Sequence, residues 1–191
     1  MHGGNEVDMS FNDEEMEIAI YGLKRLGMFA ASLMVAFVIG MLMDNVKGVF
    51  LFLLFFIPLR IFAGGLHMPK LWICAITSSL LLVGVAFVFN NVNDTWIYEK
   101  TYLAIIFAGA VVIMFLAPVD TANKPLFKEE KVRFKIISII ITIIEMAIFQ
   151  FSRDNSFVKI LIFMVITIEA FYLAVQKIVN YISEKRSESE Q

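Results

Sequence analysis

The stretch "VFLFLLFFIPLRIFAGGLHMPKLWIC", residues 49–74, joins two apolar segments through a turn that contains adjacent glycines. Long apolar segments of this kind are typical of helices in a lipid bilayer, where about 20 residues cross the hydrocarbon. We expect Pro58 to kink the first segment and Arg60 to end its apolar part. The first segment is therefore short, and it either crosses the membrane or enters and leaves it on one side.

The rest of the chain shows the same block pattern. Of its 191 residues, 59% are hydrophobic and 18% are charged, whereas ordinary soluble domains are roughly 45–50% apolar. The composition predicts a single all-α domain over residues 1–191, a polytopic transmembrane helical bundle. It has about six spans, or five if the second segment is re-entrant. The expected spans lie near residues 26–43, 49–63, 71–89, 101–118, 136–151 and 157–176.

Two terminal segments differ from these spans. In residues 12–27, Met16, Ile20 and Leu23 recur at helical spacing. This pattern predicts an amphipathic helix that lies on the membrane lipid before the first span, or else the first turns of that span. The polar tail, residues 183–191, is expected to be disordered.

The distribution of positive charge predicts the orientation of a six-span bundle. Basic residues on the side of the termini are Lys24, Arg25, Arg60, Lys70, Lys124, Lys128, Lys131, Arg133, Lys135, Lys177, Lys185 and Arg186, against Lys47, Lys100, Arg153 and Lys159 on the other side. Because cytoplasmic loops of membrane proteins are enriched in lysine and arginine, we expect a plasma-membrane protein with both termini in the cytoplasm. The turn at 60–70 would face the cytoplasm too. In a five-span fold, this assignment of the basic residues to the two sides of the membrane would no longer hold.

The turn carries a candidate nucleophile and base. Cys74 is the chain's only cysteine and His67 is one of two histidines. A thiol reacts as its thiolate, and histidine is a common activating base. Seven residues of helix rise by roughly 10 Å, so His67 must stand outside the helix that carries Cys74 in order to reach it. Pro69 is well placed to open that helix.

Three more residues of the turn have alternative interpretations. Gly64 and Gly65 either form a flexible turn or supply N–H groups to an oxyanion. Arg60 either binds a carboxylate of a substrate or fixes the turn itself. Taken singly, the cysteine is more often a small apolar filler and the histidine an interfacial anchor. The conjunction of these residue types at one membrane face favours a catalytic site.

Glu145 and Glu169 fall within the last two spans, at depths of roughly 13 Å and 11 Å from the expected cytoplasmic ends. Carboxylates inside a membrane are costly and are often functional. They are interpreted either as the lining of a polar chamber that binds peptide or as interhelical hydrogen-bonding groups, with Thr142 and Thr167 as candidate partners. A third interpretation is that they are pathway residues of a small transporter or exporter subunit. A non-catalytic membrane scaffold is a further alternative. The chain has no sequence pattern for a metal, a cofactor or nucleic acid.

The turn resembles the signature of the accessory gene regulator protein B (AgrB) family, the membrane cysteine peptidases of Gram-positive quorum sensing. The matching residues are Arg60, Ala63, Gly64, Gly65, His67 and Cys74. A second block, "APVDTANKPL" at 117–126, is similar to the family's block after the fourth span. Met68 and Pro69 depart from the family's pattern, and this affects the expected turn geometry.

The resemblance implies a cysteine endopeptidase with Cys74 as nucleophile and His67 as base. Its substrate would be an AgrD-like propeptide, cut on the cytoplasmic side before an acidic tail. A thioester acyl-enzyme would then cyclise to a thiolactone or lactone autoinducing peptide, and the family is thought to act as a homodimer.

Residues of the second block and of the basic loop have alternatives too. Lys124 and Lys128 belong to the basic loop, which would attract an acidic tail or simply fix the topology. Asp120 or Asn123 would orient His67. Alternatively, Asn123 and Lys124 would only shape the loop.

Overall fold

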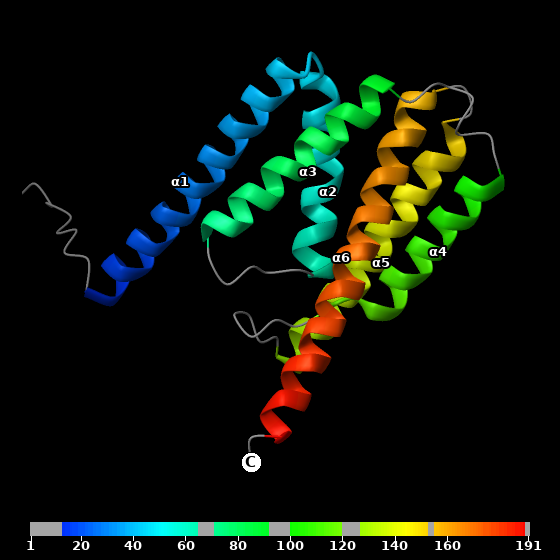
Figure 1. Ribbon diagram of the computed structural model, residues 1–191. Coiled ribbons are helices and arrows are strands. Elements are labelled where there is room, and N and C mark those ends of the chain that lie inside the picture. The colour runs from blue at the N-terminus through cyan, green and yellow to red at the C-terminus, as the bar shows by residue number, and fades with distance from the viewer. Residues whose placement is uncertain (1–12, 65–70, 92–99, 120–126, 153–154, 190–191) are drawn as a thin grey trace, which may run out of the picture. The chain divides into compact units, whose positions relative to one another are not determined.

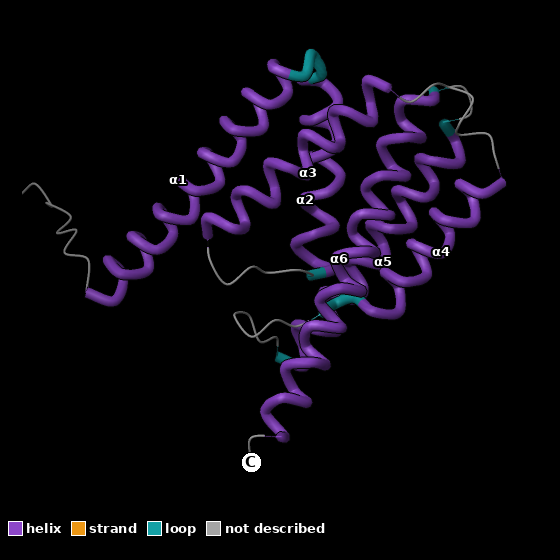
Figure 2. The backbone as a smooth tube through the Cα atoms, in the orientation of Figure 1, coloured by secondary structure: helices purple, strands orange, loops and turns teal. Residues whose placement is uncertain are grey.

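The computed structural model describes residues 13–64, 71–91, 100–119, 127–152 and 155–189, which form helices joined by short connections (Figures 1 and 2). The helices are α1 (Asp13–Leu42), α2 (Val46–Ala63), α3 (Leu71–Asn91), α4 (Lys100–Leu116), α5 (Lys128–Phe151) and α6 (Ser156–Ser189). Among these residues the only β-type pairing is an isolated bridge between Gly64 and Val119. The predicted all-α architecture is confirmed.

The helix α1 begins in one compact unit, Met1–Val35, and ends in the other, Ala36–Gln191. It is continuous from Asp13, so the amphipathic stretch and the first predicted span belong to a single helix. The bundle described below is the second unit.

Among the residues that the structure describes, four helices are long and apolar enough to cross a membrane, in the segments Met16–Leu42, Val46–Ala63, Trp72–Asn91 and Ser156–Ser183. The apolar part of α4, Thr101–Leu116, is shorter. α2 continues as a helix through Pro58 to Ala63 and is 18 residues long, within the range of about 17–25 residues that spans a bilayer. Several apolar helices of this length define a multi-pass membrane protein.

The end of α6 differs from the prediction. The helix continues to Ser189, so residues 183–189 of the tail that we expected to be disordered are helical. The physical reason is that glutamate, lysine and arginine are good helix formers. Here they extend an existing helix, which is easier than starting a new one.

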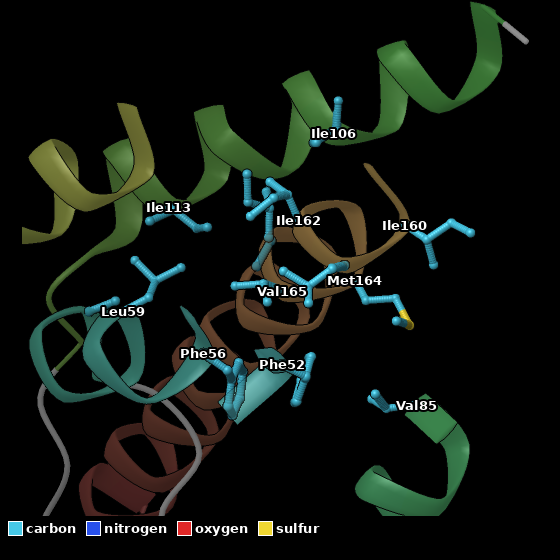
Figure 3. Close-up of a cluster of buried hydrophobic side chains, with 14 of the residues drawn as sticks. Phe52, Phe56, Leu59, Val85, Ile106, Ile113, Ile160, Ile162, Met164 and Val165 are labelled. Carbon is cyan, nitrogen blue, oxygen red and sulfur yellow. The ribbon is translucent and has the colours of Figure 1, made fainter. Parts of the chain in front are cut away.

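The helix α6 lies at the centre of the second unit and packs against α2, α3, α4 and α5. Side chains from α2, α4 and α6 fill the space between these helices (Figure 3). The buried set shown there includes Phe52, Phe56, Leu59, Ile106, Ile113, Ile162 and Val165. Gly109 brings α4 close to α6, since a Cβ atom placed there would lie 3.1 Å from Cγ2 of Ile166. Small residues at membrane helix contacts allow this close approach.

The segments after α2 and after α4 meet at the same end of the bundle. The bridge between Gly64 and Val119 joins them directly, and the amide N–H of Val119 donates to the carbonyl oxygen of Ala63 at 3.1 Å. Figure 1 shows both helices ending there, on the side toward which the C-terminal half of α6 extends. This junction is the place to which the candidate site residues lead.

Candidate active site

The candidate site begins where α2 ends, at Gly64. Its backbone has φ 81° and ψ −144°, a conformation that a residue with a side chain rarely adopts. A Cβ atom at this position would lie 2.6 Å from the carbonyl oxygen of Val119. Both the backbone conformation and the close approach of the neighbouring segment therefore require glycine here.

The N–H of Gly64 already has a hydrogen-bond partner. It donates to the carbonyl oxygen of Arg60 at 3.2 Å and so ends the helix. Our prediction that the Gly64 N–H supports an oxyanion does not fit this geometry, because the donor is used in capping α2. Gly65 remains the predicted donor, and it lies outside the described residues.

The bridge at Gly64 joins the two sequence blocks that resemble the family's pattern. Gly64 belongs to the turn at 60–74, and Val119 belongs to the block at 117–126. Segments separated by two helices in the sequence are thus in backbone contact. The structure brings together the beginning of both blocks.

Arg60, in the last turn of α2, contacts several groups around this junction. Its Nη1 atom donates to the carbonyl oxygen of Gly64 at 3.3 Å and lies 3.6 Å from Oε2 of Glu169 on α6. Its guanidinium carbon lies 4.6 Å from the ring centroid of Tyr172. Of the two alternatives for Arg60, fixing the turn is the one for which the structure provides a contact.

Cys74 is the fourth residue of α3, and its side chain is exposed. A thiol in this position is open to a reactant, unlike a cysteine that fills space between helices. α3, which carries this thiol, packs against both α2 and α6.

Glu145 on α5 and Glu169 on α6 are both buried, with 1% and 0% of their surface exposed. The two helices that carry them pack against each other. Within the described part of the chain, the carboxyl groups of Glu145 and Glu169 have no hydrogen-bond partner. Thr142 does not supply one, because its hydroxyl donates to the carbonyl oxygen of Ser138 at 2.8 Å. The Thr167 hydroxyl is likewise without a partner among these residues.

Several predicted site residues lie outside the described residues: Gly65, His67, Asp120, Asn123 and Lys124. Lys128 begins α5, and its side chain lies outside the described part. The pairing of His67 with Cys74 and the roles given to the loop after α4 therefore stay predictions.

Tyr172 is the residue of this cluster that the sequence did not identify. It stacks over Arg60, which also pairs with Glu169. The available signal was its spacing: residues three apart on a helix share a face, so Tyr172 had to face the same neighbours as the intramembrane Glu169. An aromatic residue in an apolar helix is too common to be noticed without that carboxylate.

The fold and this cluster define a multi-pass helical membrane protein with an exposed thiol and a partly buried arginine–glutamate pair. The accessory gene regulator B family matches residues 5–173, and the chain belongs to that family. The chain is 28% identical over 131 residues to an AgrB-like protein of Clostridium perfringens (strain SM101, type A), covering 65% of this chain and 60% of the relative. It is 35% identical over 126 residues to an AgrB-like protein of Listeria monocytogenes (serotype 4a, strain HCC23), covering 62% of this chain and 57% of the relative.

The chain therefore spans about 60% of the length of the curated relatives it matches. No solved structure matches it.

Proposed function

We propose that this protein is a membrane-embedded cysteine endopeptidase that processes an AgrD-like propeptide into an autoinducing peptide. It removes the C-terminal tail of the propeptide and promotes cyclisation of the preceding segment to a thiolactone or lactone. The observations that carry the proposal are the junction of the two sequence blocks at Gly64 and Val119 and the exposed thiol of Cys74. They occur in a chain whose family is established over residues 5–173.

The proposed reaction starts when His67 accepts the proton of the Cys74 thiol. The thiolate sulfur attacks the carbonyl carbon of the scissile peptide bond, so that a C–S bond forms as the C–N bond breaks. His67 then gives the proton to the leaving amine of the tail. The product is a thioester, and a cysteine or serine within the retained segment attacks it, closes the ring and releases Cys74. Water must be kept from this thioester, as a site below the membrane surface would do.

The remaining predicted residues have supporting roles in this proposal. The basic loop, with Lys124 and Lys128, attracts the acidic tail of the propeptide. Asp120 or Asn123 orients His67. Glu145 and Glu169 line a polar chamber that binds peptide, which is supported by their burial on two helices that pack against each other. If the double variant Glu145→Gln, Glu169→Gln cleaved at the wild-type rate, the chamber would be excluded.

The proposal includes orientation and assembly. Both termini and the reactive turn face the cytoplasm, as the excess of basic residues on that side favours. The protein acts as a homodimer, by analogy with its family. Attaching a reporter to either terminus and probing its accessibility from each side of the membrane would test the orientation.

The central experiment is co-expression of a candidate propeptide with the wild type, Cys74→Ala and His67→Ala. We expect both variants to insert in the membrane and to lose cleavage. Cys74→Ala should fold normally because the side chain is exposed. The matched controls are His2→Ala, at the chain's other histidine, and Ser79→Ala, at an exposed hydroxyl on the same helix as Cys74. Both controls should cleave like the wild type. Cleavage by Cys74→Ala would exclude the proposed nucleophile.

A second candidate function is a small transporter or exporter subunit. The observation in its favour is the pair of buried carboxyl groups, Glu145 and Glu169, with no hydrogen-bond partner among the described residues. The same co-expression experiment separates the two functions. A transporter would tolerate Cys74→Ala and His67→Ala and would lose activity when either carboxylate is replaced by glutamine.

A further inference from the structure

The carboxylate of Glu169 forms an ion pair with Arg60. It reaches from the middle of α6 toward the end of α2, and its side chain is fully buried. Removing a charged group from water is costly, and a buried ion pair is therefore weak evidence for stability alone. The presence of the Glu169 carboxylate at this depth is better explained by the contacts that its partner, Arg60, makes.

Arg60 connects Glu169 to the turn that carries the reactive residues. The guanidinium Nη1 that lies 3.6 Å from Glu169 also donates to the carbonyl oxygen of Gly64 at 3.3 Å. The ring of Tyr172, three residues beyond Glu169 on the same helix, lies 4.6 Å from the guanidinium carbon. A guanidinium is planar and rigid, so an ion pair and a stacked ring together restrict where its donors point.

The contacts of Arg60 act on the first residue of the turn. Gly64 is fixed by the Arg60 side chain through its carbonyl oxygen, and the adjacent Ala63 carbonyl accepts the N–H of Val119. The chain returns from this turn into α3, which carries Cys74 as its fourth residue and packs against α2 and α6. The face of α6 that holds Glu169 and Tyr172 thus lies beside the beginning of the turn.

We infer that Glu169 is a positioning residue for the reactive turn. It acts through Arg60, with Tyr172 as the stacking surface, and it contacts neither the substrate's scissile bond nor the thiol. This inference rests on the proposed function, because it assigns a purpose to the turn that carries His67 and Cys74. It adds to that function a specific link between the central membrane helix and the site.

The test uses the reactivity of Cys74, which is the chain's only thiol. The full-length protein in detergent micelles is alkylated with iodoacetamide over a range of pH, with Cys74→Ala as the blank. The variants are Glu169→Gln, Glu169→Asp and Arg60→Lys. Thr167→Val is the matched control, since it removes a buried hydroxyl two residues away on the same helix. Membrane insertion and the thermal midpoint of unfolding are measured for each variant.

We expect Glu169→Gln to slow alkylation near neutral pH by about tenfold, equivalent to moving the pH profile by about one unit. The loosened turn would no longer hold His67 against the thiol. The Glu169→Asp variant should show a smaller change, and Thr167→Val should follow the wild-type profile. Cleavage of a propeptide should fall in kcat with little change in KM. Profiles for Glu169→Gln and Thr167→Val that both overlie the wild type would overturn the inference.

Two further outcomes are also decisive. If Glu169→Gln fails to insert, Glu169→Asp and Arg60→Lys carry the test, because both keep the charges of the pair. Unchanged profiles for those two variants would overturn the inference. A shifted profile in a protein that cleaves no propeptide would contradict the proposed function alone. Cys74-dependent cleavage with an unmoved profile would contradict only the positioning role.

Discussion

The interface between α4 and α6 and the junction at the end of α2 are both parts of the bundle interior, but different forces hold them. At the first, apolar side chains and Gly109 pack closely, with Ile106, Ile113 and Ile162 buried. At the second, a backbone bridge, an ion pair and a stacked guanidinium tie three chain segments together.

Apolar packing depends on volume and tolerates changes that conserve it. A junction built on directed contacts depends on particular atoms, as does a site that must hold reacting groups in place. The difference predicts that substitutions of similar size have unequal effects in the two regions.

The largest expected effect is that of Gly64→Ala, at the junction. The φ of Gly64 is 81°, in the left-handed region that a residue with a side chain rarely adopts, and an added Cβ atom would lie 2.6 Å from the carbonyl oxygen of Val119. We expect the free energy of unfolding to fall by about 3 kcal/mol, from backbone strain together with the clash, and propeptide cleavage to be lost. Stability in detergent and cleavage on co-expression provide the two measurements.

The matched control for Gly64→Ala is Gly84→Ala in α3, where an added Cβ meets nothing within 4 Å. That variant should be as stable as the wild type or gain up to about 1 kcal/mol from helix propensity. Equal effects of the two substitutions would remove the distinction between the junction and the rest of the bundle.

The next largest effect concerns the ion pair. Arg60→Gln leaves the buried carboxylate of Glu169 without its cation, and we expect the free energy of unfolding to fall by about 2 kcal/mol. This is below the usual range for fully buried pairs because the Arg60 side chain is 24% exposed. The double variant Arg60→Gln, Glu169→Gln should recover part of the loss, since no charge is then left unpaired. Chemical unfolding in mixed micelles would measure both.

Lys177→Gln is the control for loss of a positive charge, because Lys177 is exposed on α6. It should change stability by no more than about 0.5 kcal/mol. A double variant of Arg60 and Glu169 that is less stable than either single variant would mean that the two side chains do not act as a pair.

These two regions were not equally visible in the sequence. Runs of apolar residues predicted the helices well, and α3 begins at Leu71 and α2 ends at Ala63 as expected. The end of α6, which lies in charged sequence, was predicted poorly. Charged residues are compatible with both a disordered tail and a solvated helix. Residue chemistry also identified Arg60, Cys74 and Glu169 as candidates.

The contacts among these residues were not predictable. The bridge from Gly64 to Val119 and the pairing of Arg60 with Glu169 depend on how three helices pack. Hydrophobic periodicity fixes which face of a helix is buried, but it does not say which helix it meets. An intramembrane carboxylate needs a partner. This requirement limited the candidate partners of Glu169 but did not identify Arg60 among them.

A smaller effect is expected at the apolar interface. Gly109→Ala places a Cβ atom 3.1 Å from Cγ2 of Ile166, so the helices must separate slightly. We expect a loss of about 1 kcal/mol, at the low end for overpacking, with cleavage unchanged. Adding Ile166→Leu, which conserves volume and removes the branch at Cβ, should restore most of the stability. If Gly109→Ala abolished cleavage while remaining folded, the apolar interface would be as important to the site as the junction.

The smallest effect is expected for Tyr172→Phe, at the residue where the two kinds of interaction meet. Its ring stacks over the Arg60 guanidinium and also packs edge-to-face against Phe56, with ring centroids 6.3 Å apart. Tyr172→Phe keeps both contacts and should be nearly neutral in stability. Tyr172→Leu loses both, and the cation–π part should contribute about 1 kcal/mol at this partly buried position.

The cation–π part can be isolated by a double-mutant cycle. In the Arg60→Gln background no cation lies over the ring, so Tyr172→Leu should cost about 1 kcal/mol less than it does in the wild type. Phe171→Leu, at the adjacent and 63% exposed ring, should cost the same in both backgrounds. An equal cost of Tyr172→Leu in the two backgrounds would assign the ring to apolar packing. The Tyr172 ring would then contribute by apolar packing, as side chains do at the interface between α4 and α6, and not as a stacking surface for Arg60.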